Sequence, residues 1–318
     1  MPRLTHFGAL VTTLLLAFVL GIPNGHHTTD AAEPPPIMLI TSHDSAPYQE
    51  VVMSFRHHLD QQRIEGPLLT YSLLTDSPRI EESLANAKQE AVRLFVTVGP
   101  PATQRILGAV GHIPVLACLA ANDLELRNAP NATGVTIDFS VETQLHQLQQ
   151  FLPDRKTVGV LYNPTENNAR IEEARRVAQT LGLTVLAHPV KDSRALPKAL
   201  AGLANKAEVL WGLTDRTVLS PQTAEPILLF SFRNRIPFAG LSSSWTKAGA
   251  LYALDRDYTD LGIQCGEIAI KVLQGTRAGS IPPVPPRKMT YSVNLKTARR
   301  MKVDFTPSIL EGARQVFP

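Results

Sequence analysis

A strand, a turn, a helix and a second strand follow one another without interruption between residues 157 and 190. The apolar run 158–162 has the length and β-branched content of a buried strand, and an Asn-Pro pair ends it. Apolar residues then recur at helical spacing, Gly182 follows as a helix C-cap, and residues 183–187 have the pattern of another strand. The stretch predicts a β-α-β unit, whose strand-to-helix turn lies where open α/β sheets bind ligands.

The rest of the chain repeats this alternation, and its 318 residues suffice for two α/β halves. Runs with strand character alternate with helical patterns on both sides of the central unit, which predicts an α/β protein with parallel sheets covered by helices on both faces. The other predicted strands are 37–40, 68–74, 94–98, 113–117, 134–137, 208–213, 237–240, 249–254 and 291–294. A loop is expected around residues 122–123, and helical segments are expected from 295 through 316.

The amino terminus has the order of features found in a secretory signal peptide. Arg3 precedes an apolar run at 7–22, a Pro-Asn-Gly turn ends the run, and Ala31-Ala32 offers small residues for cleavage. The run is short for a membrane-spanning helix, although an uncleaved anchor is the alternative. We expect residues 1–32 to be signal peptide and linker, and the mature protein to begin between about residues 22 and 34 in the periplasm.

Charge argues against one class of partner. The formal net charge is +3, and no dense block of lysine and arginine occurs anywhere in the chain. A nucleic-acid-binding surface usually needs such a block, so nucleic acid is not expected as a partner.

Two cysteines, Cys118 and Cys265, are present. Cys118 belongs to an apolar predicted strand and Cys265 to a predicted helix, so we expect two buried free thiols. In an oxidising compartment a bridge is the alternative, and the sequence alone does not decide the pairing.

Polar residues recur directly after short apolar strands. Because the carboxyl ends of parallel strands share one edge of a sheet, these residues are expected to converge there and form a site for a small polar ligand. For any single cluster, simple capping of the following helix is the alternative. The candidate ligand-binding residues, from these clusters and from neighbouring loops, are Ser42, His43, Tyr48, Gly99, Pro101, Ala102, Asn122, Asp138, Asn163, Thr165, Asn167, Thr214, Asp215, Arg216, Ser242, Ser243, Trp245 and Asp257.

Catalytic and cofactor signatures are weak. The stretch 240–244 has the serine of a nucleophile elbow without its second glycine, and neither a phosphate-loop nor a dinucleotide-binding glycine motif occurs. The adjacent His57 and His58 diverge by about 100° on a helix and cannot share a metal ion. We therefore expect no enzyme activity, no catalytic residues, no metal site and no cofactor.

Four segments resemble a known bacterial family. They are YNPTENNA at 162–169, LTDRTV at 213–218, KAGAL at 247–251 and YTDLG at 258–262. The chain resembles the substrate-binding proteins of ATP-driven importers related to tryptophan and tyrosine uptake. This resemblance implies a type I periplasmic-binding-protein fold, in which two Rossmann-like lobes are joined by a multi-strand hinge. The expected lobes are 33–138 with about 250–280, and 139–249 with about 281–318.

The resemblance also implies roles for some of the candidate residues. Asp215 would meet a ligand amine, Thr165 and Ser243 would hydrogen-bond polar groups, and Arg216 would suit a carboxylate or another anion. The chain departs from the family pattern at positions that include His43 and Arg216, so an aromatic amino acid is not inherited as the ligand.

The expected function is therefore that of a periplasmic receptor. It would bind a small polar organic solute, such as an amino acid or a related compound, and deliver it as a monomer to an ABC importer permease by cleft closure. The alternative is a periplasmic ligand-sensing or envelope-accessory binding module without transport.

Overall fold

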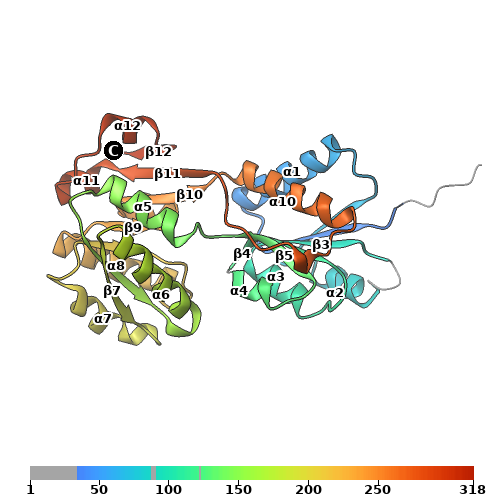
Figure 1. Cartoon of the computed structure of the whole chain (residues 1–318), viewed down its shortest axis with the longest axis horizontal. Coiled ribbons are helices and arrows are strands. Elements are labelled where there is room, and N and C mark those ends of the chain that lie inside the picture. Colours follow the sequence, from blue (N-terminus) through green and yellow to red (C-terminus); the bar gives the residue numbers. More distant parts are fainter. Residues whose placement is uncertain (1–33, 87–90, 122) are drawn as a thin grey trace, which may run out of the picture. The chain divides into compact units, whose positions relative to one another are not determined.

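The computed structural model describes residues 34–86, 91–121 and 123–318 (Figure 1). They form two β-sheets with helices on both faces, which confirms the predicted α/β class. The expected signal peptide lies outside the described residues. Within the described part of the chain, no helix is long and apolar enough to cross a membrane.

The first sheet has five strands, all parallel, in the order β2-β1-β3-β4-β5. Its four strands other than β2 are buried along their whole length, as expected for a parallel sheet covered on both faces. The strands are β1 (Ile37–Thr41), β2 (Leu68–Ser72), β3 (Leu94–Val98), β4 (Val115–Ala120) and β5 (Ala132–Thr136).

Helices α1 (Ala46–Gln61) and α10 (Tyr258–Leu273) share the apolar core on one face of the first sheet. Helices α2 (Ser77–Asn86), α3 (Pro100–Leu107) and α4 (Asp123–Arg127) pack on the other face. The contact between α1 and α10 is close, because a Cβ added at Gly262 would lie 1.9 Å from Ser54 Oγ. Only glycine allows this approach.

The second sheet has seven strands in the order β12-β11-β10-β9-β8-β6-β7. All neighbouring strands are parallel except β10 and β11. The strands are β6 (Thr157–Tyr162), β7 (Thr184–Pro189), β8 (Val209–Trp211), β9 (Phe238–Gly240), β10 (Tyr252–Arg256), β11 (Met289–Asn294) and β12 (Gln315–Phe317).

Helices also cover both faces of the second sheet. The core on one face includes side chains of α5 (Val141–Phe151) and α6 (Pro164–Thr180), and the core on the other includes side chains of α7 (Leu196–Leu203) and α8 (Pro221–Asn234). The predicted β-α-β unit is confirmed as β6-α6-β7, with Asn163 as the N-cap of α6. The remaining helices are α9 (Ser243–Ala248), α11 (Leu295–Met301) and α12 (Pro307–Glu311), with single-turn helices at Ser193–Ala195 and Ala278–Ser280.

The chain passes between the two sheets three times, after β5, after β10 and before β11. As a result, α10 packs on the first sheet although it lies between two strands of the second. Strand β10 pairs with β9 and β11, so residues 252–256 belong to the second sheet, whereas a first-lobe segment was expected from about 250. The division into lobes otherwise remains a prediction.

Three local expectations were wrong. Residues 315–317 form strand β12 beside β11 instead of ending a helix, and residues 123–127 form helix α4 where a loop was expected. Cys118 and Cys265 form a disulfide, whereas free thiols were expected. Their Cα atoms are 6.2 Å apart because α10 packs against β4, a proximity that two positions 147 residues apart do not reveal in sequence.

Candidate functional site

Five of the predicted residues meet at the carboxyl ends of β1 and β3. Ser42 accepts a hydrogen bond from the backbone N–H of Ala102 (2.9 Å), and the ring of His43 packs edge-on against Tyr48. Gly99 has φ +97°, and a Cβ there would lie 2.6 Å from the Tyr48 ring and 2.8 Å from Ser42 Oγ. Glycine therefore lets the turn before α3 approach these side chains. Burial raises the pKa of Tyr48, and the positive charge of Arg256 opposes that rise.

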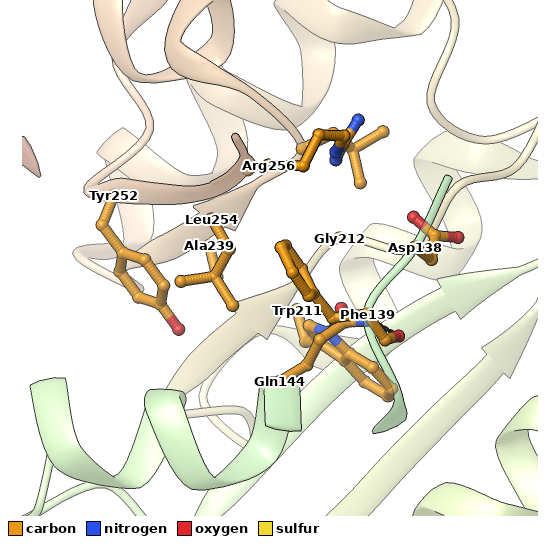
Figure 2. Close-up of a pocket in the computed structure, with 11 residues that line it drawn as sticks. Asp138, Phe139, Gln144, Trp211, Gly212, Ala239, Tyr252, Leu254 and Arg256 are labelled. Atoms are coloured by element: carbon orange, nitrogen blue, oxygen red, sulfur yellow. Dashed lines mark hydrogen bonds between the residues drawn. The ribbon is translucent and has the colours of Figure 1, made fainter. Parts of the chain in front are cut away.

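A pocket opens at the carboxyl ends of β8, β9 and β10, three neighbouring parallel strands of the second sheet (Figure 2). Its polar lining includes Asp138, Gln144 and Arg256, and its aromatic lining includes Phe139 and Trp211. The cavity volume is about 20 Å³, which is room for about one water molecule. This space can receive a functional group of a solute, and the rest of the solute would lie outside it.

Asp138 is held firmly in this pocket. Its Oδ2 accepts a 2.6 Å hydrogen bond from Arg170 Nη1, and its Oδ1 accepts a 2.7 Å hydrogen bond from Thr214 Oγ1. The residue is 8 % exposed, so the charge of Arg170 stabilises a carboxylate that is largely removed from water. A ligand amine could still reach the remaining lone pairs of Asp138.

Gln144 and Trp211 form a second fixed pair in the pocket. The indole N–H of Trp211 donates to Gln144 Oε1 at 2.9 Å, and Gln144 Nε2 donates to the backbone oxygen of Phe139 at 2.8 Å. These bonds fix the orientation of the amide and of the indole ring, which gives the pocket a rigid aromatic wall.

Arg256 is the cation of the pocket. It ends β10 and lies on the same side of the strand as Tyr252 and Leu254, because side chains alternate along a strand. The residue is 8 % exposed, and its Nε has no hydrogen-bond partner among the residues that the structure describes. Its guanidinium lies 5.9 Å from the centre of the Tyr258 ring. Burial raises the pKa of Tyr258 to about 12, which the charge of Arg256 partly opposes.

Asp215 is buried in a network of internal hydrogen bonds. Its Oδ1 accepts from the backbone N–H groups of Thr217 (2.9 Å) and Val218 (2.8 Å). Its Oδ2 accepts from the backbone N–H of Asn163 (2.6 Å) and from Asn167 Nδ2 (2.9 Å). Four donors already use this carboxylate, and the residue is 3 % exposed, so the geometry favours a structural role over contact with a ligand amine.

Other candidate residues lie apart from the pocket lining. Pro101, Thr165 and Arg216 are exposed, and Arg216 forms an ion pair with Glu166 at 3.5 Å. Ser242 is the N-cap of α9, Ser243 is its first residue, and Trp245 packs edge-on against Phe238 in the core around α7 and α8. Asn122 lies outside the described residues.

Asp257 caps helix α10 and pairs with a lysine. Its Oδ1 accepts from the backbone N–H of Asp260 (3.0 Å), and its Oδ2 lies 2.7 Å from Lys288 Nζ. Burial acts to raise the pKa of Asp257, but the hydrogen bonds from Lys288 and Asp260 outweigh it, so the pKa lies below its ordinary value. The carboxylate of Asp257 thus already binds α10 and the segment that leads into β11.

Sequence reasoning missed Arg256, Gln144, Trp211 and Phe139. Arg256 carried one usable signal, since it ends the strand in the same register as the large apolar residues Tyr252 and Leu254. Gln144 and Trp211 carried none, because a glutamine on a helix and a tryptophan in a strand occur routinely in ordinary packing. Among the described residues, no group of three histidine, cysteine, aspartate or glutamate side chains is arranged to hold a metal ion.

Two lobes of parallel α/β structure, linked by several crossings, define the type I periplasmic-binding-protein fold, to which structures similar to this chain belong. The family described as "ABC transporter substrate binding protein" matches residues 37–317, so the chain belongs to that family. Proteins of this family bind solutes and typically work outside the cytoplasm.

Individual relatives share a quarter or less of their aligned residues with this chain. A tyrosine-binding protein of Clostridioides difficile is 25% identical over 236 residues, covering 71% of this chain and 68% of the relative. The ligand-free, open structure of a substrate-binding protein with adhesive properties from Clostridium difficile has a TM-score of 0.71 at 21% identity, covering 89% of this chain and 99% of that one. An ABC domain in complex with L-Trp from Streptococcus pneumonia has a TM-score of 0.64 at 19% identity, with the same two coverages.

Proposed function

We propose that the protein is a periplasmic receptor that binds a small polar organic solute and delivers it to an ABC importer. The observation that carries the proposal is the pocket at the ends of β8, β9 and β10, where a carboxylate, an amide and a guanidinium surround a fixed indole. Ligands of open α/β sheets bind at this edge. A chain of a substrate-binding family with such a pocket is suited to solute capture.

An amino acid or a related compound fits this chemistry. Asp138 and Arg256 place charges of opposite sign in one pocket, and a solute with both an amine and an acid would meet both. Relatives described as binding tyrosine and L-Trp agree with this class. The aromatic wall of Phe139 and Trp211 would pack against an apolar part of the solute.

Native mass spectrometry of gently purified protein tests solute capture. We expect a retained small molecule, recovered chemically unchanged because the protein binds and does not convert it. Uptake of that molecule by cells should fall when either this chain or a neighbouring permease is deleted. A chain that binds the molecule while uptake proceeds normally in its absence would instead be a sensing or accessory module.

Export is the second part of the proposal. Residues 1–32 would direct the chain to the periplasm and be removed, as their charged, apolar and small-residue order indicates. The intact mass of protein released by osmotic shock should place the new amino terminus between about residues 22 and 34. Recovery of the full-length chain from the cytoplasm would contradict export.

Cleft closure is the proposed mechanism of delivery. The cluster of Ser42, His43, Tyr48 and Gly99 at the first sheet and the pocket at the second would each contact the solute. A solute that gains contacts in the closed form shifts the equilibrium toward closure by that difference in affinity. Small-angle scattering should show a smaller radius of gyration when the retained solute is added to emptied protein. An unchanged scattering curve at saturation would rule the mechanism out.

A further inference from the structure

The guanidinium of Arg256 is buried and incompletely bonded. It lines the pocket, only 8 % of the residue is exposed, and its Nε finds no acceptor among the described residues. An arginine side chain cannot lose its proton at any ordinary pH, so this donor stays charged. Burying a charged donor without a hydrogen bond is costly, and proteins usually pair such a group.

The nearest acid does not supply the missing bond. Asp255 Oδ1 lies 3.9 Å from Arg256 Nε, which is too far for a hydrogen bond, and it already accepts the backbone N–H of Arg256 at 2.9 Å. The centre of the Tyr258 ring lies 5.9 Å from the guanidinium carbon, and the ring face provides electrostatic attraction rather than a hydrogen bond. Asp255 and the Tyr258 ring therefore partly offset the positive charge of Arg256, but neither accepts a hydrogen bond from its Nε.

Asp138 and Gln144, the other polar side chains named in the pocket, already have hydrogen-bond partners within the protein. Asp138 is bound by Arg170 and Thr214, and Gln144 bridges Trp211 and Phe139. In the described part of the chain, none of these groups accepts a hydrogen bond from Arg256 Nε, so its acceptor must come from elsewhere. The cavity of about 20 Å³ has room for one functional group of a solute rather than for a whole solute.

We infer that the solute carries a carboxylate and that Arg256 receives it, which rests on the proposed function and narrows it to acidic or zwitterionic solutes. A carboxylate presents two parallel acceptors that match the arginine fork, and it is the planar anion that such a site binds with two hydrogen bonds. Arg170 is already paired with Asp138 and does not compete for the carboxylate of the solute.

Arg256→Met tests the role because it keeps bulk and removes the donors. A structural arginine would lower the melting temperature of the empty protein when removed. A ligand-binding arginine should change that temperature little, because its removal breaks no side-chain hydrogen bond of Arg256 in the described part of the chain and loses only the 3.9 Å ion pair with Asp255 and the contact with the Tyr258 ring. Arg194→Met, at a position whose side chain is 89% exposed, is the matched control.

The binding probe is a set of acids with their primary amides, namely L-tyrosine and L-tyrosinamide, L-tryptophan and L-tryptophanamide, and any acid found by native mass spectrometry with its amide. Calorimetry should show at least one acid binding the wild type about 10- to 100-fold more tightly than it binds Arg256→Met, the scale of a charge-assisted bond. The matching amide should bind the wild type and Arg256→Met with similar affinity. Arg194→Met should bind like the wild type.

Three outcomes would overturn the inference. They are equal binding of an acid by the wild type and Arg256→Met, a retained solute without an acidic group, and no binding of any acid in the set. The first two leave the proposed function intact, because a solute is still captured. A different result would contradict only the proposed function. In that case Arg256 is needed to bind the acid, but cells take the acid up equally well without this chain.

Discussion

Arg170 on helix α6 donates a 2.6 Å hydrogen bond to Asp138, which lies in the crossing that follows strand β5. The same carboxylate accepts from Thr214 after strand β8, so three separate segments meet at one group. The position of the Asp138 carboxylate in the pocket thus depends on an ion pair whose two side chains are 20% and 9% exposed.

Asp138→Asn should reduce stability. The substitution leaves the Arg170 guanidinium without its carboxylate, and we expect the free energy of unfolding to fall by about 1–3 kcal/mol, toward the lower end because Arg170 retains some contact with water. Urea unfolding measures the change. Arg175→Gln, which breaks an exposed pair on the same helix, should cost less than about 0.5 kcal/mol. Equal effects of the two substitutions would contradict this ranking.

Asp215→Asn should reduce stability strongly, although Asp215 does not line the pocket. Two of the four donors bound to this carboxylate would face an amide N–H₂ group, and we expect a loss of at least about 2 kcal/mol in the free energy of unfolding. Thermal unfolding of the empty protein detects it, with the exposed Asp154→Asn as control. A variant with normal melting behaviour and weakened amine binding would restore Asp215 to the ligand contacts.

Removing the disulfide should destabilise the chain. The double variant Cys118→Ala/Cys265→Ala frees a 147-residue loop in the unfolded state, which corresponds to a loss of about 2–4 kcal/mol. Denaturant unfolding with and without reductant measures it, because reductant should lower the wild type to the level of the variant and leave the variant unchanged. Thiol titration of the unfolded wild type before reduction should find no free thiol. Two reactive thiols there would show that the bond is absent.

Glu208 should make stability sensitive to acid. Its carboxylate accepts the backbone N–H groups of Lys156 (2.7 Å) and Thr157 (2.8 Å), and these bonds hold its pKa below the ordinary value. Because the pKa of Glu208 is lower in the folded than in the unfolded state, its carboxylate stabilises the fold at pH values above the unfolded pKa of about 4.3. This stabilisation is lost as the pH falls through the folded-state pKa.

Glu208→Gln should therefore lower the free energy of unfolding by about 0.5–1.5 kcal/mol at pH 7, at the lower end because water screens the group. The gap between wild type and variant should narrow as the pH falls below the unfolded pKa of about 4.3. Urea titrations at pH 7, 5 and 3 follow it. A gap that stays constant across this range would mean that the carboxylate is not the source.

Long periodic segments were predictable from sequence, and short or distant relationships were not. The β6-α6-β7 unit was predicted because an apolar strand run, apolar residues at helical spacing and a following glycine agree. Strand β12 has only three residues, too few for a period to show. Arg256 became visible as a binding candidate only once β10 had neighbours, because its burial and missing acceptor are properties of the packed sheet.

The place of α10 in the chain sets the order in which the protein can finish folding. All strands of the first sheet have been synthesised by residue 136, yet Leu261, Cys265 and Ile268 of α10 belong to its core and are made only after strands β6 to β10. Of the two helices on this face of the first sheet, only α1 is therefore present while most of the second sheet is synthesised. The first half therefore completes its core only after most of the second half has been made, and the second sheet is completed later still, by β11 and β12.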